Sequence, residues 1–524
     1  MRGRCVWDPR RSGSIAPRRR RAGARGRIAL DTPTRKPNLS KKKTVLGVLA
    51  AAIALAYAGS TWWAGNKVKS VYDSAFAQLP QQTALVRVTE RSYERGFLGA
   101  VSTVTLELGC PADAAVAGAP PADPEEEDGE EAAPTPSKPL RLSFRDTIRH
   151  GPLAGGSLAA ATIDSELLLD IKGQAEARKV FGDARPFGAH TRVGFDGGYA
   201  SDITLAPGQF ADEGKTRVSW QGAQLRVRVD GARTAAHYEL ALPGFEAADL
   251  RNGVSLKMGK LDARADLDIR HGWMLATGKS AGRLDALEFT VAGKKADADA
   301  APAKPFPAIV LQGLDAASDA TIENGLYTGT ATFKGTGSVG ATRIDGFEMA
   351  SSTRRIDVGG YRKLAEAWTR SAAANGCVRG KASQAALRAL ADQLAPDLKA
   401  MAKQGPEVGL DRLLVEIDGQ RAEFSYSVAM AGVTDEDLQL PGNALLLKRG
   451  VLKANGRLPV KWIEKIAESA SGSQAPSPEV AALMIEQFEQ QGYLKRAGDD
   501  VTSQIEFSGG QLKLIGKPVE LPAK

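Results

Sequence analysis

The chain is poor in residues that hold metal ions, with 3 Cys and 4 His among its 524 residues. It contains no C-x-x-C and no H-E-x-x-H motif, and no histidine has a partner at metal-ligand spacing. No Ser or Cys stands in a recognisable nucleophile elbow. We therefore expect no metal, no cofactor and no catalytic triad. The four histidines are His150, His190, His237 and His271.

A net positive charge is missing from most of the chain, although the formal net charge of the whole is +8. Residues 1–43 hold 11 Arg and 4 Lys against two Asp, so the sum over the remaining residues is mildly acidic. A phosphate-binding face needs clustered Lys and Arg, which the body of the chain lacks. The sequence therefore argues against nucleic acid as a partner. We expect the basic arm 1–43 to be disordered and, as its functional interpretation, attracted to anionic lipid. The alternative is that the arm is an extension upstream of the true start.

Long apolar runs are absent except for one, "TVLGVLAAAIALAYAGSTWWA" at 44–64. As a helix it would rise roughly 31 Å, enough to cross a membrane. The lysines at 41–43 place its amino-terminal side in the cytoplasm, and Trp62 and Trp63 suit the opposite headgroup layer. A signal peptide cleaved after Ala58 is the alternative. We expect a single-pass inner-membrane anchor with a periplasmic body from residue 65 onward.

Cysteine is too scarce for a disulfide framework, and only Cys110 and Cys377 fall in the expected periplasmic body. Two cysteines outside the inner membrane can oxidise to a disulfide. Two unpaired thiols are the alternative, and the sequence leaves both open.

Residues 111–139 form an acidic Pro/Ala-rich insert with eight carboxylates and one lysine. The carboxylates are contiguous and do not alternate with Gly as in an EF-hand loop, so a solvated, disordered loop is expected. The insert separates the start of the body (65–110) from a β-rich part (140–360). A helical segment (361–405) and a last part (406–524) follow.

Apolar residues alternate with polar ones from about residue 140 onward. In "LDARADLDIR" (261–270) Leu267 and Ile269 face one way and the charged residues face the other, and 224–230, 236–242 and 422–430 repeat the pattern. Gly, Asp and Asn punctuate the strands every eight to twelve residues, as in antiparallel sheets with one wet face. The prediction is an α+β fold, a large curved antiparallel β-sheet with helices packed on one side.

Helices are expected at 361–374 and 383–394, before Pro396, and at 477–492 after a Ser477 cap. A carboxy-terminal hairpin should turn at Gly509-Gly510. Four such strands offer more apolar surface than these helices can cover, and an uncovered remainder marks a ligand groove or an interface. The expected groove lining is Leu225, Val227, Leu240, Leu267 and Ile269.

Two short motifs need interpretation. "GTGSVG" (335–340) matches a dinucleotide fingerprint, but the following "ATRIDGFEM" alternates like a strand, so a strand and turn are expected. "IRHG" occurs at 148–151 and 269–272, each time where a strand ends in glycine. We expect His150 to hydrogen-bond the turn before Pro152 and to transfer no proton.

These pieces in this order resemble the YdgA-like family, bacterial proteins built around a domain of unknown function. The resemblance runs from about residue 44 to the end and is carried by "YERGFLGA" (93–100), "NGRLPVKWI" (455–463) and "FSGGQLKLIGKP" (507–518). "HGPL" is the most recognisable element and consists of His150, Gly151, Pro152 and Leu153. The resemblance implies an inner-membrane anchor and a periplasmic α+β body. It supplies no catalytic residue.

The expected function is a non-catalytic role in a Gram-negative envelope, with lipid or another envelope protein bound through the sheet. The alternative is an envelope hydrolase that uses carboxylate chemistry, because paired carboxylates could lie anywhere among 61 acidic residues. An open apolar groove would favour binding, and clustered carboxylates in one deep pocket would favour the hydrolase. The sequence leaves the oligomeric state open.

Overall fold

The computed structural model of the protein describes residues 54, 56–70, 72–74, 76, 86–108, 140–212, 215–291, 306–375, 381–463 and 478–519. Apart from Ala54, they belong to one compact unit, residues 56–524. The basic arm, most of the expected anchor, the acidic insert, Cys110 and Cys377 lie outside them. Within the described part of the chain, no helix is long and apolar enough to cross a membrane.

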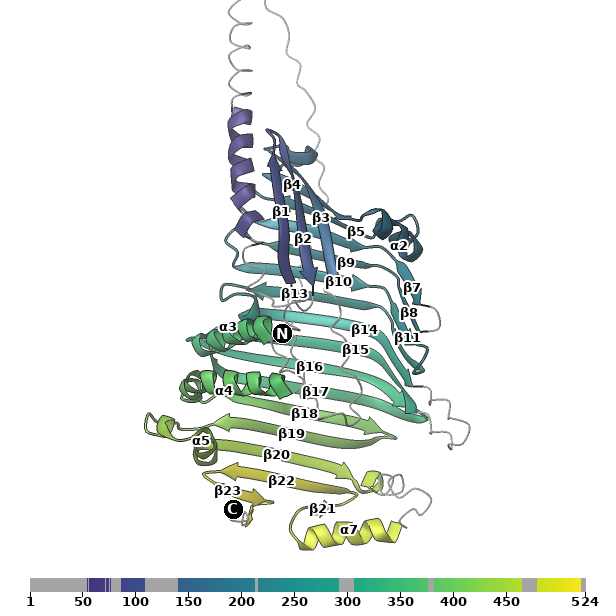
Figure 1. Ribbon diagram of the computed structural model, residues 1–524. Coiled ribbons are helices and arrows are strands. Elements are labelled where there is room, and N and C mark those ends of the chain that lie inside the picture. Colours follow the sequence, from purple (N-terminus) through teal and green to yellow (C-terminus); the bar gives the residue numbers. More distant parts are fainter. Residues whose placement is uncertain are drawn as a thin grey trace, which may run out of the picture. The chain divides into compact units, whose positions relative to one another are not determined.

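A large curved antiparallel sheet dominates the fold (Figure 1). Every pairing among its described strands is antiparallel. The strands are β1 (Val86–Arg95), β2 (Gly99–Leu108), β3 (Leu140–His150), β4 (Ala161–Leu168), β5 (Phe187–Val193), β6 (Tyr199–Leu205), β7 (Gly208–Asp212), β8 (Thr216–Trp220), β9 (Ala223–Val229), β10 (Ala235–Leu242), β11 (Phe245–Asp249), β12 (Val254–Met258), β13 (Leu261–Asp268), β14 (Thr277–Val291), β15 (Phe306–Glu323), β16 (Leu326–Val339), β17 (Thr342–Asp357), β18 (Glu407–Ile417), β19 (Gln420–Met430), β20 (Gly450–Pro459), β21 (Lys495–Ala497), β22 (Asp500–Ser508), β23 (Gln511–Leu514) and β24 (Lys517–Val519).

The sheet branches at β14. Strands β1 to β6 pair in chain order, and the sheet continues through β9, β10 and β13 to the first half of β14. The second half of β14 pairs with β12, which leads to β11, β8 and β7. Beyond β14 the sheet runs through β15 to β20 and then β22 to β24. Most of the sheet is therefore one long ladder of neighbouring strands.

Irregular registers bend the long strands. The pairing shifts between Gln312 and Asp315 on β15, between Gly335 and Gly337 on β16, and at 410–413 on β18. Gly313 takes the left-handed φ of 58° that such an extra residue requires. Bulges of this kind increase the local twist of a strand. Their recurrence on successive strands accounts for the curvature of the sheet.

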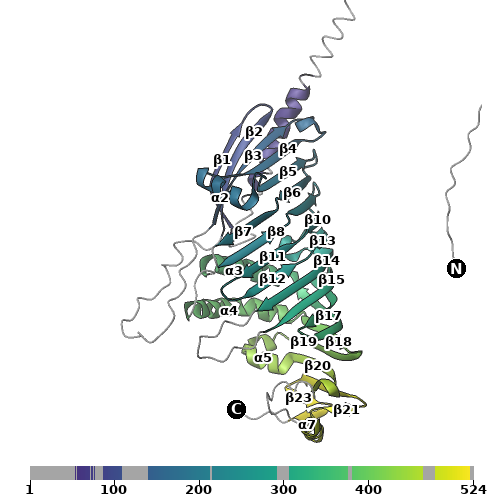
Figure 2. The same ribbon diagram turned by 90° about the vertical axis from the view of Figure 1, so that its right-hand side faces the viewer.

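The helices lie at the margins of the sheet. In Figure 2, α3 and α4 lie to one side of the long strands. The first helical segment, residues 56–70 and 72–74, packs on β2 and β3 through the core described below. The other helical elements are α2 (Ile171–Phe181), α3 (Val358–Asn375), α4 (Lys381–Ala402), α5 (Gly442–Arg449), α7 (Pro478–Gln490) and the 3-10 turns η2 (Ala154–Gly156), η3 (Trp273–Leu275) and η4 (Asp437–Gln439).

Several predicted elements are present, and one boundary was wrong. The strands expected at 224–230, 236–242, 261–270 and 422–430 are β9, β10, β13 and β19, and Gly509-Gly510 joins β22 to β23. "GTGSVG" forms the end of β16 and the start of the turn that follows it, as expected. The helix expected to stop before Pro396 instead continues to Ala402. Proline removes one backbone hydrogen bond, and the burial of Met401 and Ala402 in the next turn stabilises the continuation.

The best-defined core lies under the first helical segment. Val68 and Tyr72 from this segment pack with Val104 of β2, Ile148 of β3 and Val193 of β5. Tyr199 of β6 borders this core and also a second one formed by Val229, Ala236 and Ile269. The two cores are therefore continuous along the sheet.

Candidate functional site

One face of the sheet carries three adjacent rows of residues without a charge. Directly paired residues of antiparallel strands point to the same side, so the printed registers define rows across the strands. Each row crosses twelve strands, from β5 to β20. We call the surface formed by the three rows the apolar face. The first row is Ala189, Ile203, Leu225, Leu240, Ala263, Gly282, Ala316, Phe333, Met349, Leu413, Phe424 and Gly456.

The second and third rows follow at two-residue steps along the strands, except for the three-residue step from Leu413 to Leu410 at the bulge of β18. The second is Thr191, Ser201, Val227, Tyr238, Ala265, Ser280, Ser318, Ala331, Ser351, Leu410, Tyr426 and Ala454. The third is Val193, Tyr199, Val229, Ala236, Leu267, Gly278, Ala320, Gly329, Thr353, Val408, Val428 and Leu452. At the usual strand spacing, twelve strands span roughly 50 Å.

The opposite face is charged. Arg226 lies 3.0 Å from Asp202 and 3.6 Å from Glu239, and His237 lies 2.6 Å from Asp266. Further along the sheet, cross-strand pairs join Lys279 to Asp319, Arg283 to Asp315, and Arg412 to Glu423. Exposed pairs of this kind add little stability, but their regular placement shows that this face meets water.

The apolar face is open over its later strands. Met349, Val408, Phe424, Tyr426 and Val428 are each 40–46% exposed, although all belong to the three rows. A shallow apolar pocket of about 410 Å³ adjoins them, lined by Leu413, Phe424, Leu458, Tyr493 and Val501 among others. Isolated exposed apolar residues are ordinary, but a contiguous set marks an interaction site.

The five predicted groove residues all lie on this side of the sheet. Leu225, Val227, Leu240 and Leu267 are members of the rows, and Ile269 is buried beside Val229 and Ala236. Their role in binding stays a prediction. Sequence reasoning missed the more exposed Met349, Val408 and Phe424, although the alternation in 422–430 already signalled that Phe424, Tyr426 and Val428 share a face.

The "HGPL" element lies at the end of β3, against the first helical segment. His150 is the last residue of β3 and is 2% exposed, and its backbone N–H donates to the Leu98 carbonyl at 3.0 Å. A Cβ at Gly65 would lie 2.9 Å from His150 Cε1, and one at Gly151 would lie 2.8 Å from Thr61 Oγ1. Both glycines therefore permit close packing of helix and strand.

The expected hydrogen bond from the His150 ring to the turn is not present, which corrects that prediction. Neither ring nitrogen has a partner among the described residues, and the same is true of the buried Thr61 hydroxyl. Burial, and then the positive charge of Arg95, lower the pKa of His150 below its ordinary value of 6.5. The nearby backbone of Gly99 and Thr61 raises the pKa of His150 by a smaller amount, although neither carbonyl is placed to accept a hydrogen bond from the ring. The ring therefore packs under the helix, and its lowered pKa keeps it uncharged above pH 6.5.

Many carboxylates of the described residues pair with cations, and others, such as the buried Asp146, accept hydrogen bonds from uncharged groups. Asp437 is the most buried of them, and Lys448 and Arg449 both lie 2.7 Å from it while Thr434 donates to it. These hydrogen bonds hold the pKa of Asp437 well below its usual range. Among the described residues no group of three His, Cys, Asp or Glu could hold a metal ion.

The comparisons with known proteins give one match. The family described as bacterial proteins of unknown function (DUF945) matches residues 40–522, which is most of the chain. No curated protein and no solved structure matches. The chain therefore belongs to the DUF945 family of bacterial proteins.

Proposed function

We propose that the protein is a YdgA-like, membrane-anchored protein of the Gram-negative envelope that binds lipid acyl chains along its apolar face. The observation that carries the proposal is the set of three uncharged rows across twelve strands, half-open to solvent at its later end. The side chains expected at 224–230 and 261–270 are part of these rows.

The dimensions of the face favour lipid over a compact ligand. One leaflet of a bilayer core is roughly 15 Å thick, so a face of roughly 50 Å is longer than a single acyl chain. Its middle strands, β14 and β15, contribute only small side chains to the rows, namely Gly278, Ser280, Gly282, Ala316, Ser318 and Ala320. Larger side chains lie further along the sheet on either side, such as Tyr238 on β10 and Phe333 on β16. This alternation gives a shallow floor on which flexible chains can lie.

The proposed topology combines the sequence with the position of the first helical segment. Thr61 and Ala64 are fully buried against the body, so the proposed span lies within residues 44–60, close to the minimum length for a membrane helix. Trp62 and Trp63 are exposed, as residues at a headgroup layer should be. Protease added to spheroplasts should degrade the body, and a protected body would contradict the proposed orientation.

Lipid analysis of the purified full-length protein tests the binding proposal. The expected result is co-purified phospholipid that is lost in the Tyr426→Asp variant, because a carboxylate on the apolar face cannot be solvated by acyl chains. Ser425→Asp places the same charge on the opposite face of β19 and should retain the lipid. Equal lipid content in all three proteins would contradict the proposal. Hydrolysis of an envelope substrate without bound lipid would favour the alternative of a hydrolase.

A further inference from the structure

Exposed apolar side chains gather at one end of strands β1 to β4. Among the described residues, seven large apolar side chains are 57% exposed or more: Trp62, Phe97, Leu98, Leu140, Leu153, Leu158 and Leu483. Five of the seven belong to this end, and Trp63 beside them is 48% exposed. We call Trp62, Trp63, Phe97, Leu98, Leu153 and Leu158 the apolar tip. Exposed apolar residues that are clustered in this way mark an interaction site, whereas isolated ones are ordinary.

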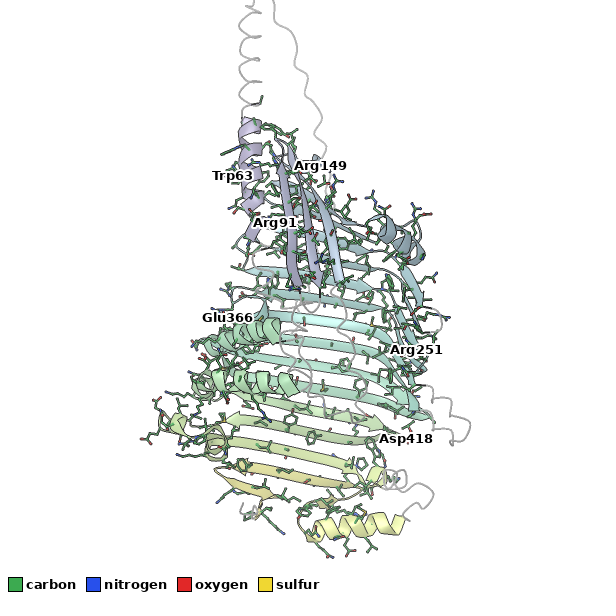
Figure 3. All side chains as sticks on the ribbon, in the orientation of Figure 1. Trp63, Arg91, Arg149, Arg251, Glu366 and Asp418 are labelled. Carbon is green, nitrogen blue, oxygen red and sulfur yellow. The ribbon has the colours of Figure 1, made fainter. Side chains whose placement is uncertain are left out.

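Hydrogen bonds hold the three parts of the apolar tip together. The turn of Phe97 and Leu98 joins β3 through the bond from His150 N–H to the Leu98 carbonyl, 3.0 Å. The helical segment joins the same turn because Arg95 Nη2 donates to the Trp62 carbonyl at 3.1 Å. Figure 3 shows Trp63 and Arg149, the residue before His150, at the same end of these strands, with Arg91 further along. The tip is thus one assembled surface.

Several backbone N–H groups of the tip form hydrogen bonds within the tip itself or with the adjacent strand ends. Gly96 N–H donates to Gly99, Gly151 to Ala160, Ala154 to Gly151 and Gly156 to Leu153, all at 2.8–3.2 Å. Backbone donors without partners are costly where water is scarce. A loop whose donors bond internally can present Leu153 and Leu158 to an apolar layer at lower cost.

We infer that the apolar tip inserts into the headgroup layer of the phospholipid bilayer and places the beginning of the apolar face at the membrane surface. The tip combines a turn, a loop and part of the helical segment, and its two tryptophans follow closely on the apolar sequence 44–60. Ala160 N–H donates to the carbonyl of Val193, the first residue of the third row, at 2.9 Å. The inference rests on the proposed envelope location and adds a second membrane contact to it.

The test uses the full-length chain in vesicles of phosphatidylethanolamine and phosphatidylglycerol. Cys5, Cys110 and Cys377 are replaced by Ser, and an environment-sensitive fluorophore is attached at Leu158→Cys. Leu483→Cys is the matched control, because Leu483 on α7 is similarly exposed, at 63% against 81%. Spin-labelled lipid should quench the label at residue 158 severalfold and leave the label at residue 483 unchanged.

A second variant tests the same insertion with the label on the turn between β1 and β2 and the substitutions on the loop after β3. Leu153→Asp with Leu158→Asp alters exposed side chains, so the fold should be retained, and a label at Leu98→Cys should lose its quenching. Labels at 158 and 483 that are equally accessible to water would overturn the inference, even if lipid still occupied the apolar face. A quenched tip on a protein without lipid on its apolar face would support the inference and contradict the proposed function.

Discussion

At the scale of single residues, the contact between Gly65 and His150 joins the helical segment to the sheet. A methyl group at Gly65 would meet the imidazole at 2.9 Å, a distance that forces one of them to move. Overpacking of this kind costs about 1–3 kcal/mol. We predict that Gly65→Ala raises the hydrogen exchange of helix amides 61–70 by the corresponding factor. In a His150→Ala background the same substitution should cost much less, because the imidazole is gone and only the flexible guanidinium of Arg95, 3.0 Å from the same position, has to move.

Gly59 provides the control for that double-mutant cycle. It lies in the same helical segment, and a Cβ there would have nothing within 4 Å. Gly59→Ala should therefore leave exchange unchanged or slow it, since alanine favours helix by up to about 1 kcal/mol. Equal effects of Gly65→Ala with and without His150 would show that the two residues do not oppose each other.

The depressed pKa of His150 predicts a pH dependence of helix docking. The ring stays neutral in the folded state at a pH at which the released ring, with its ordinary pKa of 6.5, takes up a proton. Docking is therefore at full strength above pH 6.5 and weakens as the pH falls below that value, until the folded pKa is reached. Exchange of amides 61–70, corrected for intrinsic rates, should show this loss in the wild type and not in His150→Phe.

Local exchange is the right measurement for this prediction, because a second histidine changes the stability of the fold with pH in the opposite direction. Asp266 and then Glu239 raise the pKa of His237, which gives a small stabilisation that appears as the pH falls. Global unfolding would combine the two effects. A wild-type helix whose exchange is independent of pH would contradict the role assigned to His150.

The position of His150 at a strand end was predictable from the sequence, and its contacts were not. "HGPL" follows an alternating stretch and contains a turn-forming Gly-Pro, so the end of β3 was expected there. Neither alternation nor composition indicates that this end meets residues 61 and 65, which lie more than eighty positions upstream in the chain. Such a contact depends on tertiary packing, which local sequence does not encode.

At the scale of elements, Tyr72 fixes the later part of the first helical segment. Its buried hydroxyl donates a hydrogen bond to the Asp146 carboxylate and lies 3.0 Å from Ser102 Oγ. Tyr72→Phe leaves the buried carboxylate without this donor, a change that costs about 1–3 kcal/mol. We predict faster proteolysis between this segment and β1. Tyr57→Phe, at a 37% exposed position of the same segment, should have no effect; equal rates for both variants would exclude the anchoring role of Tyr72.

Strands were easier to predict than helix ends. Alternation over 261–270 or 422–430 reports burial on one face directly, and β13 and β19 follow it closely. Pro396 was expected to lie beyond a helix end because proline disrupts a lone helix. In α4 the burial of Met401 and Ala402 outweighs that local preference.

At the scale of the whole sheet, the proposed function depends on the register of the strands, which the sequence pattern does not reveal. Alternation showed that each strand has an apolar side, and it led to Leu225, Val227, Leu240 and Leu267. Only the pairings show that these sides align into three uncharged rows across twelve strands. The small residues of β14 and β15 carry no strong hydrophobic signal, so the floor of the apolar face could not be predicted.

The most direct test of the account is photocrosslinking in living cells at two neighbouring residues of β19. A photoreactive phenylalanine analogue replaces either Tyr426 on the apolar face or Ser425 on the charged face, and the protein is irradiated and analysed by mass spectrometry. The account predicts phospholipid adducts at position 426 and none at position 425. Adducts at neither position, equal adducts at both, or crosslinks at position 426 to protein alone would contradict it.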